Sequence, residues 1–227
     1  MAFQEKNTSE LLSEEMLMGV PKATLNRLPL YYSYLIDKQR EGHSYASSTD
    51  ISTSLKMSSI LVRKDLSYVS KHAGKPKLGF EIAPLLKDLT TYLGYDNTTD
   101  AILIGVGRLG RTLMCYKGFE RYGLNIVAGF DTDEDFFGME IGGRPVLHMC
   151  KLTKLIERMH IKIGIITVPG DQAQEVADML VNAGILAIWN FAPVHIETPR
   201  HVIVQNVNLA ASLAALSQEL AVALRNK

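Results

Sequence analysis

Apolar residues in the first third of the chain recur at the spacing of an amphipathic helix. Between Pro21 and Gly42 they return every three or four positions, as expected of one buried helix face. Proline is favoured in the first turn of a helix, and glycine often follows its last residue. The pattern predicts a helix between these two residues, with a core face of Leu25, Leu28, Tyr32, Leu35 and Ile36.

Two shorter helices follow, separated by a tight turn. Ser47 or Ser48 is placed to cap the first helix, which carries Asp50 in its first turn. After the turn, Ser58 is placed to cap the second helix, which covers residues 58–70. Two short helices joined in this way are typical of a helix-turn-helix motif, whose second helix enters the major groove of DNA.

A basic hairpin and a further helix complete the predicted first domain. Residues 71–80, KHAGKPKLGF, combine three lysines with two glycines and one proline, which favours a turn and predicts a wing. Residues 82–94 again have helical spacing, and the polar run 95–100 marks a boundary. We therefore expect a winged-helix domain over residues 20–95, after an N-terminal extension over residues 1–19.

From residue 100 onward, short and almost continuously apolar runs alternate with helical patterns. Strands of this kind are typical of a parallel sheet that is covered by helices on both faces. The runs cover residues 101–104, 126–130, 161–168, 185–191 and 202–207. The chain is therefore predicted to be an α/β protein with a Rossmann domain over residues 96–207.

The last segment, residues 208–227, has the pattern of a helix with a broad apolar face. Alanines occupy many of the positions between its leucines, so we expect this face to be buried against another surface. The leucines recur every three or four residues, as Leu209, Leu213, Leu216, Leu220 and Leu224.

A glycine motif lies between the first predicted strand of this domain and a helix predicted over residues 108–118. Residues 105–110, GVGRLG, match G-x-G-x-x-G. The three glycines allow a tight turn, the approach of a pyrophosphate, and close packing of helix against strand. The pyrophosphate is expected at the N-terminus of the helix, where free N–H groups favour an anion. This context predicts a dinucleotide site.

Asp131 is expected to set the choice of dinucleotide. It ends the second predicted strand, where a carboxylate can accept a hydrogen bond from the adenosine ribose. The same carboxylate would repel a 2′-phosphate, which favours NAD over NADP. Its distance from the glycine motif is longer than the usual ~20 residues, a small departure from the pattern.

The charge distribution points to an anionic partner for the first domain. The formal net charge of the chain is zero, but residues 20–80 carry ten Lys and Arg against four Asp and Glu. Residues 1–19 and 81–227 each carry a net charge of −3. A local basic region next to a helix-turn-helix indicates double-stranded DNA.

Other classes of protein fit the sequence less well. No apolar run reaches the ~18 residues of a membrane span, and the acidic N-terminus is unlike a signal peptide. Cys115 and Cys150 have no metal or redox spacing, and we expect both to be buried in a reduced, cytoplasmic protein without a metal site. The histidines with potential acid–base function form no catalytic pattern, so no enzyme activity is expected; they are His148, His160, His195 and His201.

Several motifs resemble the Rex family of redox-sensing repressors, from residue 20 to about residue 222. In the first domain these are Val20–Leu25, Arg27-Leu28-Pro29, Tyr31-Tyr32 and Val62–Tyr68. In the second they are Gly105–Gly110, Gly129-Phe130-Asp131, Thr167-Val168-Pro169 and Asn190–Val194. The resemblance implies a homodimer whose C-terminal helix swaps onto the Rossmann domain of its partner. It also implies that NADH weakens DNA binding, so that genes of reductive metabolism are released when the NADH/NAD⁺ ratio rises.

Three positions depart from the pattern of that family. Rex proteins usually carry an arginine on the first helix, a tyrosine after the wing and an aspartate before the last helix, which exchange contacts between the two states. The matching positions here are Ser33, Phe80 and Asn208. The wing also lacks the family's aromatic, glycine-rich run. These departures imply a conserved fold with a weakened switch.

The sequence thus predicts two sites. The NAD(H) site comprises Gly105, Val106, Gly107, Arg108, Leu109, Gly110, Asp131, Thr132, Asp133, Thr167, Val168, Pro169, Asn190, Phe191 and Ala192. The DNA-binding surface comprises Lys22, Ser58, Ser59, Arg63, Lys64, Ser67, Tyr68, Lys75 and Lys77.

Two alternatives to a redox-sensing repressor remain open. One is a Rex-like sensor with lost or weakened DNA binding that acts through a protein partner, against which the basic wing argues. The other is a small NAD-dependent oxidoreductase, against which the lack of sequence for a substrate domain argues.

Overall fold

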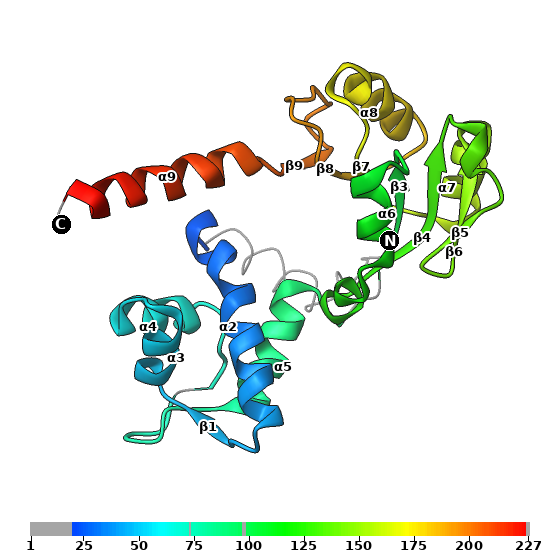
Figure 1. Cartoon of the computed structure of the whole chain (residues 1–227). Helices are drawn as coiled ribbons and strands as arrows, with labels where there is room; N and C mark the ends of the chain where they lie inside the picture. Colours follow the sequence, from blue (N-terminus) through cyan, green and yellow to red (C-terminus); the bar gives the residue numbers. More distant parts are fainter. Residues whose placement is uncertain (1–19, 73, 97–98, 226–227) are drawn as a thin grey trace, which may run out of the picture. The chain divides into compact units, whose positions relative to one another are not determined.

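The protein is described from a computed structural model, which defines residues 20–72, 74–96 and 99–225. The chain divides into two units, one ending at Asp96 and the other beginning at Asn97 (Figure 1). The predicted N-terminal extension lies outside the described residues. Among the described residues, no helix is both long and apolar enough to cross a membrane.

The described part of the N-terminal unit contains the four predicted helices. They pack around a core of fully buried side chains that includes Leu28, Leu35, Leu66 and Leu89. The helices are α2 (Lys22–Arg40), α3 (Ser48–Leu55), α4 (Ser59–Ser67) and α5 (Ile82–Leu93).

The helix-turn-helix forms as predicted, except at one cap and at the end of α4, which stops at Ser67 and not at residue 70. Ser47 and Asp50 make a capping box at the start of α3, in which each side chain accepts a hydrogen bond from the backbone N–H of the other. Lys56 makes the tight turn with a left-handed φ of 54°. Ser58 lies at the N-cap position of α4 but its hydroxyl makes no capping hydrogen bond there, so that part of the prediction is wrong.

The wing is a tight turn on a minimal sheet. Strand β1 (Tyr45–Ala46) pairs in antiparallel orientation with β2 (Phe80–Glu81). Residues 75 and 79 form an isolated bridge, so the basic segment folds back on itself between them. The approach of this turn to β1 requires Gly79, because a Cβ there would overlap the backbone of Ala46.

The C-terminal unit is built on a mostly parallel sheet of seven strands within the described residues. Their order is β5-β6-β4-β3-β7-β8-β9, and only β5 is antiparallel to its neighbour. The strands are β3 (Thr99–Ile104), β4 (Leu124–Asp131), β5 (Glu140–Ile141), β6 (Arg144–His148), β7 (Ile163–Ile166), β8 (Ala187–Asn190) and β9 (Ile203–Asn206).

Helices cover both faces of this sheet, as the apolar strands predicted. Ile102 and Ile104 of β3 pack in one core with α7 (Leu152–Met159) and α8 (Ala173–Asn182). The intervening Leu103 faces the other side, in a second core with α6 (Arg108–Cys115). The alternation arises because successive side chains of a strand point to opposite faces.

Some elements were missed or misjudged from the sequence. Strands β5 and β6 form a hairpin at Gly142-Gly143, and in β6 only Val146 is buried, so no apolar run marks it. Helix α7 has only eight residues and was also missed. The helix predicted over 108–118 ends at Cys115. Cys115 and Cys150 are both exposed, which corrects the expectation that they are buried.

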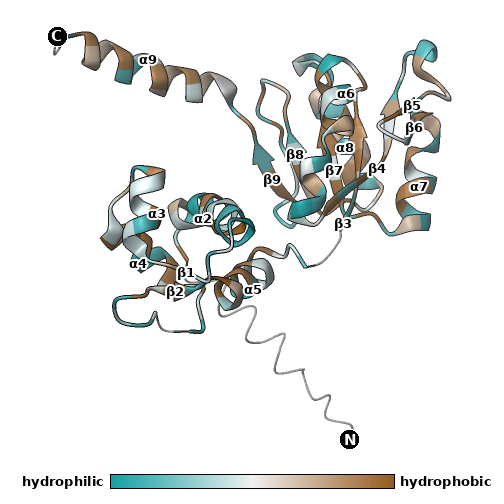
Figure 2. Cartoon of the chain, turned by 60° about the horizontal axis from the view of Figure 1, so that its bottom comes forward, coloured by the Kyte–Doolittle hydropathy of each residue, from teal (hydrophilic) through white to brown (hydrophobic). Residues whose placement is uncertain are grey.

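The C-terminal helix α9 (Leu209–Arg225) forms as predicted, but its apolar residues from Ala210 onward are exposed in the single chain. Leu213, Leu216 and Leu224 are each more than 60% exposed. Apolar positions recur along its whole length (Figure 2). The predicted burial of this face is therefore not provided by the chain itself.

Candidate cofactor site and DNA-binding surface

The glycine loop lies at the carboxyl end of β3, in the middle of the sheet. The chain continues from β3 to β4 on one side, whereas β7 pairs with β3 on the other. Ligands of open parallel sheets bind at such a point, where successive connections leave in opposite directions. The strand order therefore places the predicted motif at the binding crevice.

The three glycines of the loop differ in what a side chain at each position would meet. Gly105 has a φ of 96°, and a Cβ there would come within 2.8 Å of Val168. A Cβ on Gly110 would overlap the carbonyl oxygen of Gly105, so only glycine lets α6 pack this closely. Gly107 has an ordinary φ of −70°, and its Cβ would meet nothing within 4 Å. Packing does not require glycine at 107, which leaves open space for a ligand.

Two polar side chains hold the loop from the neighbouring strands. The carboxylate of Asp131, at the end of β4, accepts a hydrogen bond of 2.6 Å from the backbone N–H of Val106. The hydroxyl of Thr167, directly after β7, donates to the carbonyl oxygens of Ile104 and Gly105 at 3.0 and 2.6 Å. Both residues were predicted as ligand contacts, and both also fix the backbone that faces the ligand.

A cavity of about 470 Å³ joins the loop to both neighbouring strands and to α8. Seven predicted residues line it, namely Gly105, Gly107, Asp131, Thr132, Thr167, Val168 and Pro169. Six further lining residues were missed, namely Ile104, Met149, Gln172, Glu175, Val176 and Met179. Four of these lie at helical spacing, but the sequence does not show which face of α8 lines the site.

The other five residues predicted in this region do not line the cavity. Val106 is fully buried, and Gly110 lies under the loop as described above. Arg108 and Leu109 form the exposed first turn of α6. The side chain of Asp133 accepts a hydrogen bond from the backbone N–H of Asp135, within its own turn.

The predicted segment from Asn190 to Ala192 lies elsewhere. Phe191 and Ala192 line a second cavity, together with residues that precede and begin α9. Asn190 is fully buried, and its amide binds the carbonyl oxygen of Val194 and the side chain of Asn206 at 2.9 and 2.8 Å. Its side-chain oxygen accepts a hydrogen bond from the backbone N–H of Ala192. The polar atoms of Asn190 thus shape this second cavity.

The first cavity fits a dinucleotide without a 2′-phosphate. Free space above Gly107 adjoins the N-terminus of α6, where backbone N–H groups favour a pyrophosphate. Asp131 is half-buried and holds only backbone donors: Oδ1 accepts from Thr132 and Asp133, whereas Oδ2 accepts only from Val106 and keeps acceptor capacity for a ribose hydroxyl. Asp131 and Glu175 are the only charged residues that line it in the described part of the chain. Both are acidic, which disfavours an added phosphate.

In the N-terminal unit, one face of α4 is open to solvent. Arg63, Lys64 and Ser67 are exposed on it, and Ile60 is 74% exposed. Of the other predicted contacts, Lys22 and Ser58 are exposed, whereas Ser59 and Tyr68 are partly buried. The hydroxyl of Ser67 donates to the carbonyl oxygen of Lys64, one turn earlier. The helix thus presents two cations that no ion pair in the described residues neutralises.

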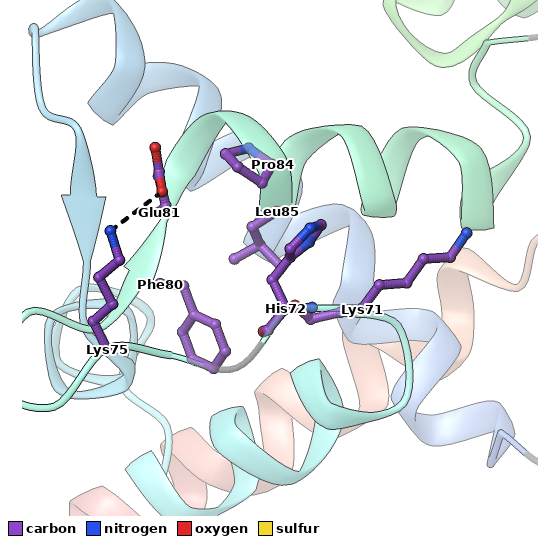
Figure 3. A pocket seen from close by; sticks show the side chains of 8 residues that line it. Lys71, His72, Lys75, Phe80, Glu81, Pro84 and Leu85 are labelled. Carbon is purple, nitrogen blue, oxygen red and sulfur yellow. Dashed lines mark hydrogen bonds and ion pairs between the residues drawn. The ribbon is translucent and has the colours of Figure 1, made fainter.

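The two wing lysines have different surroundings. The ammonium group of Lys75 donates to the Tyr45 hydroxyl at 2.8 Å and lies 3.7 Å from the Glu81 carboxylate. Lys77 is exposed at the tip of the turn, with a left-handed φ of 66°. Figure 3 shows the pocket beside this turn, with Lys75 reaching Glu81 and the ring of Phe80 turned inward. Lys77 is therefore the freer cation of the two.

A buried polar network that the sequence analysis missed joins α4 to α2. The Asp65 carboxylate, 1% exposed, accepts hydrogen bonds from the Thr24 hydroxyl at 2.9 Å and the Tyr31 hydroxyl at 2.6 Å. It also accepts two from the Arg27 guanidinium, at 2.6 and 2.8 Å. The spacing of Thr24, Arg27 and Tyr31 places them on one face of α2. Only the packing of α2 on α4 identifies Asp65 as their partner.

The network sets the charge states of its members. Burial by itself would raise the pKa of the Asp65 carboxyl, but the hydrogen bonds from Arg27, Tyr31 and Thr24 outweigh it and lower that pKa. The hydrogen bond with Asp65 also raises the pKa of Arg27. Burial, with the hydrogen bond to Asp65, raises the pKa of Tyr31 to about 12. Asp65 and Arg27 are therefore charged, and Tyr31 is a neutral donor.

Two known families match separate parts of the chain. The family described as "Putative DNA-binding protein N-terminus" matches residues 19–67. The family described as "CoA binding domain" matches residues 96–194. The first covers the helix-turn-helix, and the second covers most of the sheet with its glycine loop.

Full-length relatives match nearly the whole chain. The redox-sensing transcriptional repressor Rex of Porphyromonas gingivalis is 41% identical over 92% of this chain and 94% of its own. The Rex repressor of Bacteroides thetaiotaomicron is 39% identical over 88% and 91%. These identities extend over both units.

Solved structures of RSP, a Rex-family repressor, have the same fold. Its complex with β-NAD⁺ and operator DNA has a TM-score of 0.81 at 35% identity, over 92% of this chain and 98% of that one. Its complex with β-NADH has a TM-score of 0.79 at 36% identity, over 89% and 94%. The chain belongs to the Rex family of redox-sensing transcriptional repressors.

Proposed function

We propose that this Rex repressor binds its operator as a homodimer, through α4 and the turn at residues 75–79, and holds NAD(H) at the glycine loop. The observation that carries the proposal is the pairing of two unlike sites in one chain. One unit presents unpaired cations on an open helix face, and the other holds a loop shaped for a dinucleotide. Rex proteins are transcriptional repressors rather than enzymes. The two sites therefore need only to bind DNA and NAD(H), without catalysing a reaction.

On the DNA side, we assign different roles to the two groups of residues. Arg63 and Lys64 project from the open face of α4, where long cationic side chains can reach guanine edges in a major groove. Lys77 at the wing tip and Lys22 at the start of α2 are exposed cations suited to phosphate contacts. Asp65 keeps α4 in place through α2 and itself stays out of the interface.

On the cofactor side, this chain's residues bind and orient NAD(H). The N-terminus of α6 and the space over Gly107 would hold the pyrophosphate, and Asp131 would accept from the adenosine ribose. Bound NAD(H) supplies a nicotinamide whose oxidation state the protein reads. We place that ring toward the cavity lined by Phe191 and Ala192, beside the start of α9.

The dimer is proposed from the exposed face of α9. The side chains of Leu213, Leu216, Leu220, Val222 and Leu224 are 44–63% exposed in the single chain, although full burial of one such side chain contributes about 1.5–3 kcal/mol. A 17-residue amphipathic helix with one uncovered face fits exchange with a second copy, as the family resemblance implies. On the sheet, Trp189 and Phe191 are only partly buried and offer an apolar surface in the C-terminal unit. A protein bound to chromosomal DNA would work in the cytoplasm.

The redox response is expected to be weak. Ser33 is exposed on α2, and Phe80 has no hydroxyl. Asn208 uses its carbonyl oxygen to cap α9 through the N–H of Ala211, at 2.9 Å. None of the three can form the charge-assisted contacts that the family pattern implies, each worth about 1.5–3 kcal/mol. A neutral hydrogen bond in their place contributes about 0.5–1.5 kcal/mol.

The test is a matched pair of DNA titrations. Bound sequences are first selected from a random duplex library, and affinity is then measured with saturating NADH and with saturating NAD⁺. We expect salt-dependent binding that both dinucleotides change by similar, small factors. A loss of about a hundredfold with NADH alone would refute the weak response and leave a strong switch built from other residues. If no duplex binds, action through a protein partner becomes the better account.

A further inference from the structure

One face of α8, with the residue directly before it, lines the cofactor cavity, and no part of the glycine motif accounts for it. Glu175, Val176 and Met179 of α8 follow Gln172 by three, four and seven residues, so the four form one stripe beside the face that packs on the sheet. Met149, which follows β6, lines the same cavity. The stripe is apolar at Val176 and Met179 and polar at Gln172 and Glu175.

This arrangement suits a flat base with a polar edge. Asp131 and Thr132 lie at one side of the cavity, where the adenosine ribose is expected, and the base attached to it must lie close by. Met149, Val176 and Met179 offer the apolar surface on which a purine ring can pack. Met179 is 38% exposed, so the slot opens toward solvent.

Glu175 is available to bind the edge of the base. Its carboxylate has no hydrogen bond or ion pair in the described part of the chain, whereas Gln174 and Asp178 on another face of α8 bind each other at 3.0 Å. A carboxylate is an acceptor only, so it pairs with a donor and repels a carbonyl oxygen. Adenine presents an amine at its edge, and hypoxanthine presents a carbonyl at the same position.

We propose that Glu175 is a specificity-determining residue that accepts a hydrogen bond from the exocyclic amine of the adenine ring. The inference rests on the proposed NAD(H) site and deepens it. Selectivity for adenine then comes from the helix after β7, whereas rejection of a 2′-phosphate comes from Asp131. A single negative charge on α8 thus restricts the sensor to adenine dinucleotides.

The test compares NADH with the reduced nicotinamide hypoxanthine dinucleotide by calorimetric titration of the full chain. The wild-type protein should bind NADH about tenfold more tightly than the hypoxanthine analogue. Glu175→Gln should bring this ratio close to one, because an amide can turn to accept from an amine or donate to a carbonyl. Glu175 is exposed, so this substitution leaves the core intact.

Asp178→Asn is the matched control, since it removes the same charge from the same helix outside the cavity. It should keep the wild-type ratio. Equal binding of the two dinucleotides by the wild type, or an unchanged ratio in Glu175→Gln, would overturn the assignment and leave the NAD(H) site standing. Failure of the wild type to bind either dinucleotide would overturn the site itself and this inference with it.

Discussion

Replacing Asp65 by asparagine removes one negative charge at the junction of α2 and α4 and keeps the size of the side chain. The carboxylate accepts four hydrogen bonds, two of them from the Arg27 guanidinium. An asparagine at this position has one acceptor oxygen, and its NH₂ group would face donors. The guanidinium would lose its charged partner while its side chain stays only 22% exposed.

The expected cost follows from this geometry. Removing one partner of a buried ion pair typically destabilises a protein by about 3–5 kcal/mol. The partial exposure of Arg27 lets water replace some of the lost contacts, so we expect the lower end of that range. Because Asp65 connects α4 to α2, the remaining folded protein should also bind its operator less tightly.

Two spectroscopic probes separate the two units during urea unfolding. Trp189, the single tryptophan, lies in β8 of the C-terminal unit, so its fluorescence reports that unit. Far-UV circular dichroism reports the helices of both units. Asp65→Asn should move the part of the dichroism transition that comes from the N-terminal unit to lower urea and leave the tryptophan transition in place.

Asp37→Asn provides the control in the same unit, on α2, the helix that carries Arg27. Asp37 is 63% exposed and pairs with Arg40 at 3.7 Å, and exposed pairs contribute about 0–1 kcal/mol. It should shift the transition very little. If Asp65→Asn shifts the dichroism transition no more than Asp37→Asn does, the network does not stabilise the unit as argued.

The same network predicts the direction of a pH effect. The pKa of Asp65 is lowered in the folded protein, so its stabilisation is complete above the ordinary aspartate pKa of about 3.9. It is lost as the pH falls through the lowered pKa. The stability difference between wild type and Asp65→Asn should be constant between about pH 5 and 8 and narrow in stronger acid. A difference that widens on acidification would contradict this sign.

Three further predictions address the cofactor, the DNA and the dimer. Gly107→Asp should abolish NADH binding, measured by calorimetry, without unfolding the protein, because the new side chain enters open space. Affinity retained within a few-fold would show that the glycine loop is not part of the NADH site. Lys77→Ala should lower the slope of log affinity for DNA against log salt concentration by about one unit. Lys75→Ala should lower it by less, because Tyr45 and Glu81 hold that lysine; equal effects of the two variants would show that both lysines contact phosphate alike. Deleting residues 208–227 should cause aggregation or loss of the dimer in light scattering, and a soluble dimer without them would show that α9 is dispensable.

The fold was predictable where the signal is local. Helix α3 could be recognised from Ser47 and Asp50, because a capping box involves residues only three apart. The glycine loop was recognisable because the roles of Gly105 and Gly110 depend on one turn and the helix that follows it. The hairpin of β5 and β6 escaped prediction because a short strand with a single buried residue has no apolar run.

The same distinction between local sequence signals and tertiary packing applies to the residues of the binding sites. The sequence by itself determined which residues could bind a pyrophosphate and a ribose, since these groups follow strands and glycines directly along the chain. Only the tertiary structure decided that Met149 and the stripe of α8 share a cavity with Asp131, and that Asp65 meets Arg27 from another helix. The reason is physical: strand order and the rotation of a helix about its axis are set by packing between segments far apart in sequence. The position of Glu175 in the sequence does not determine which element of the fold its side chain will face.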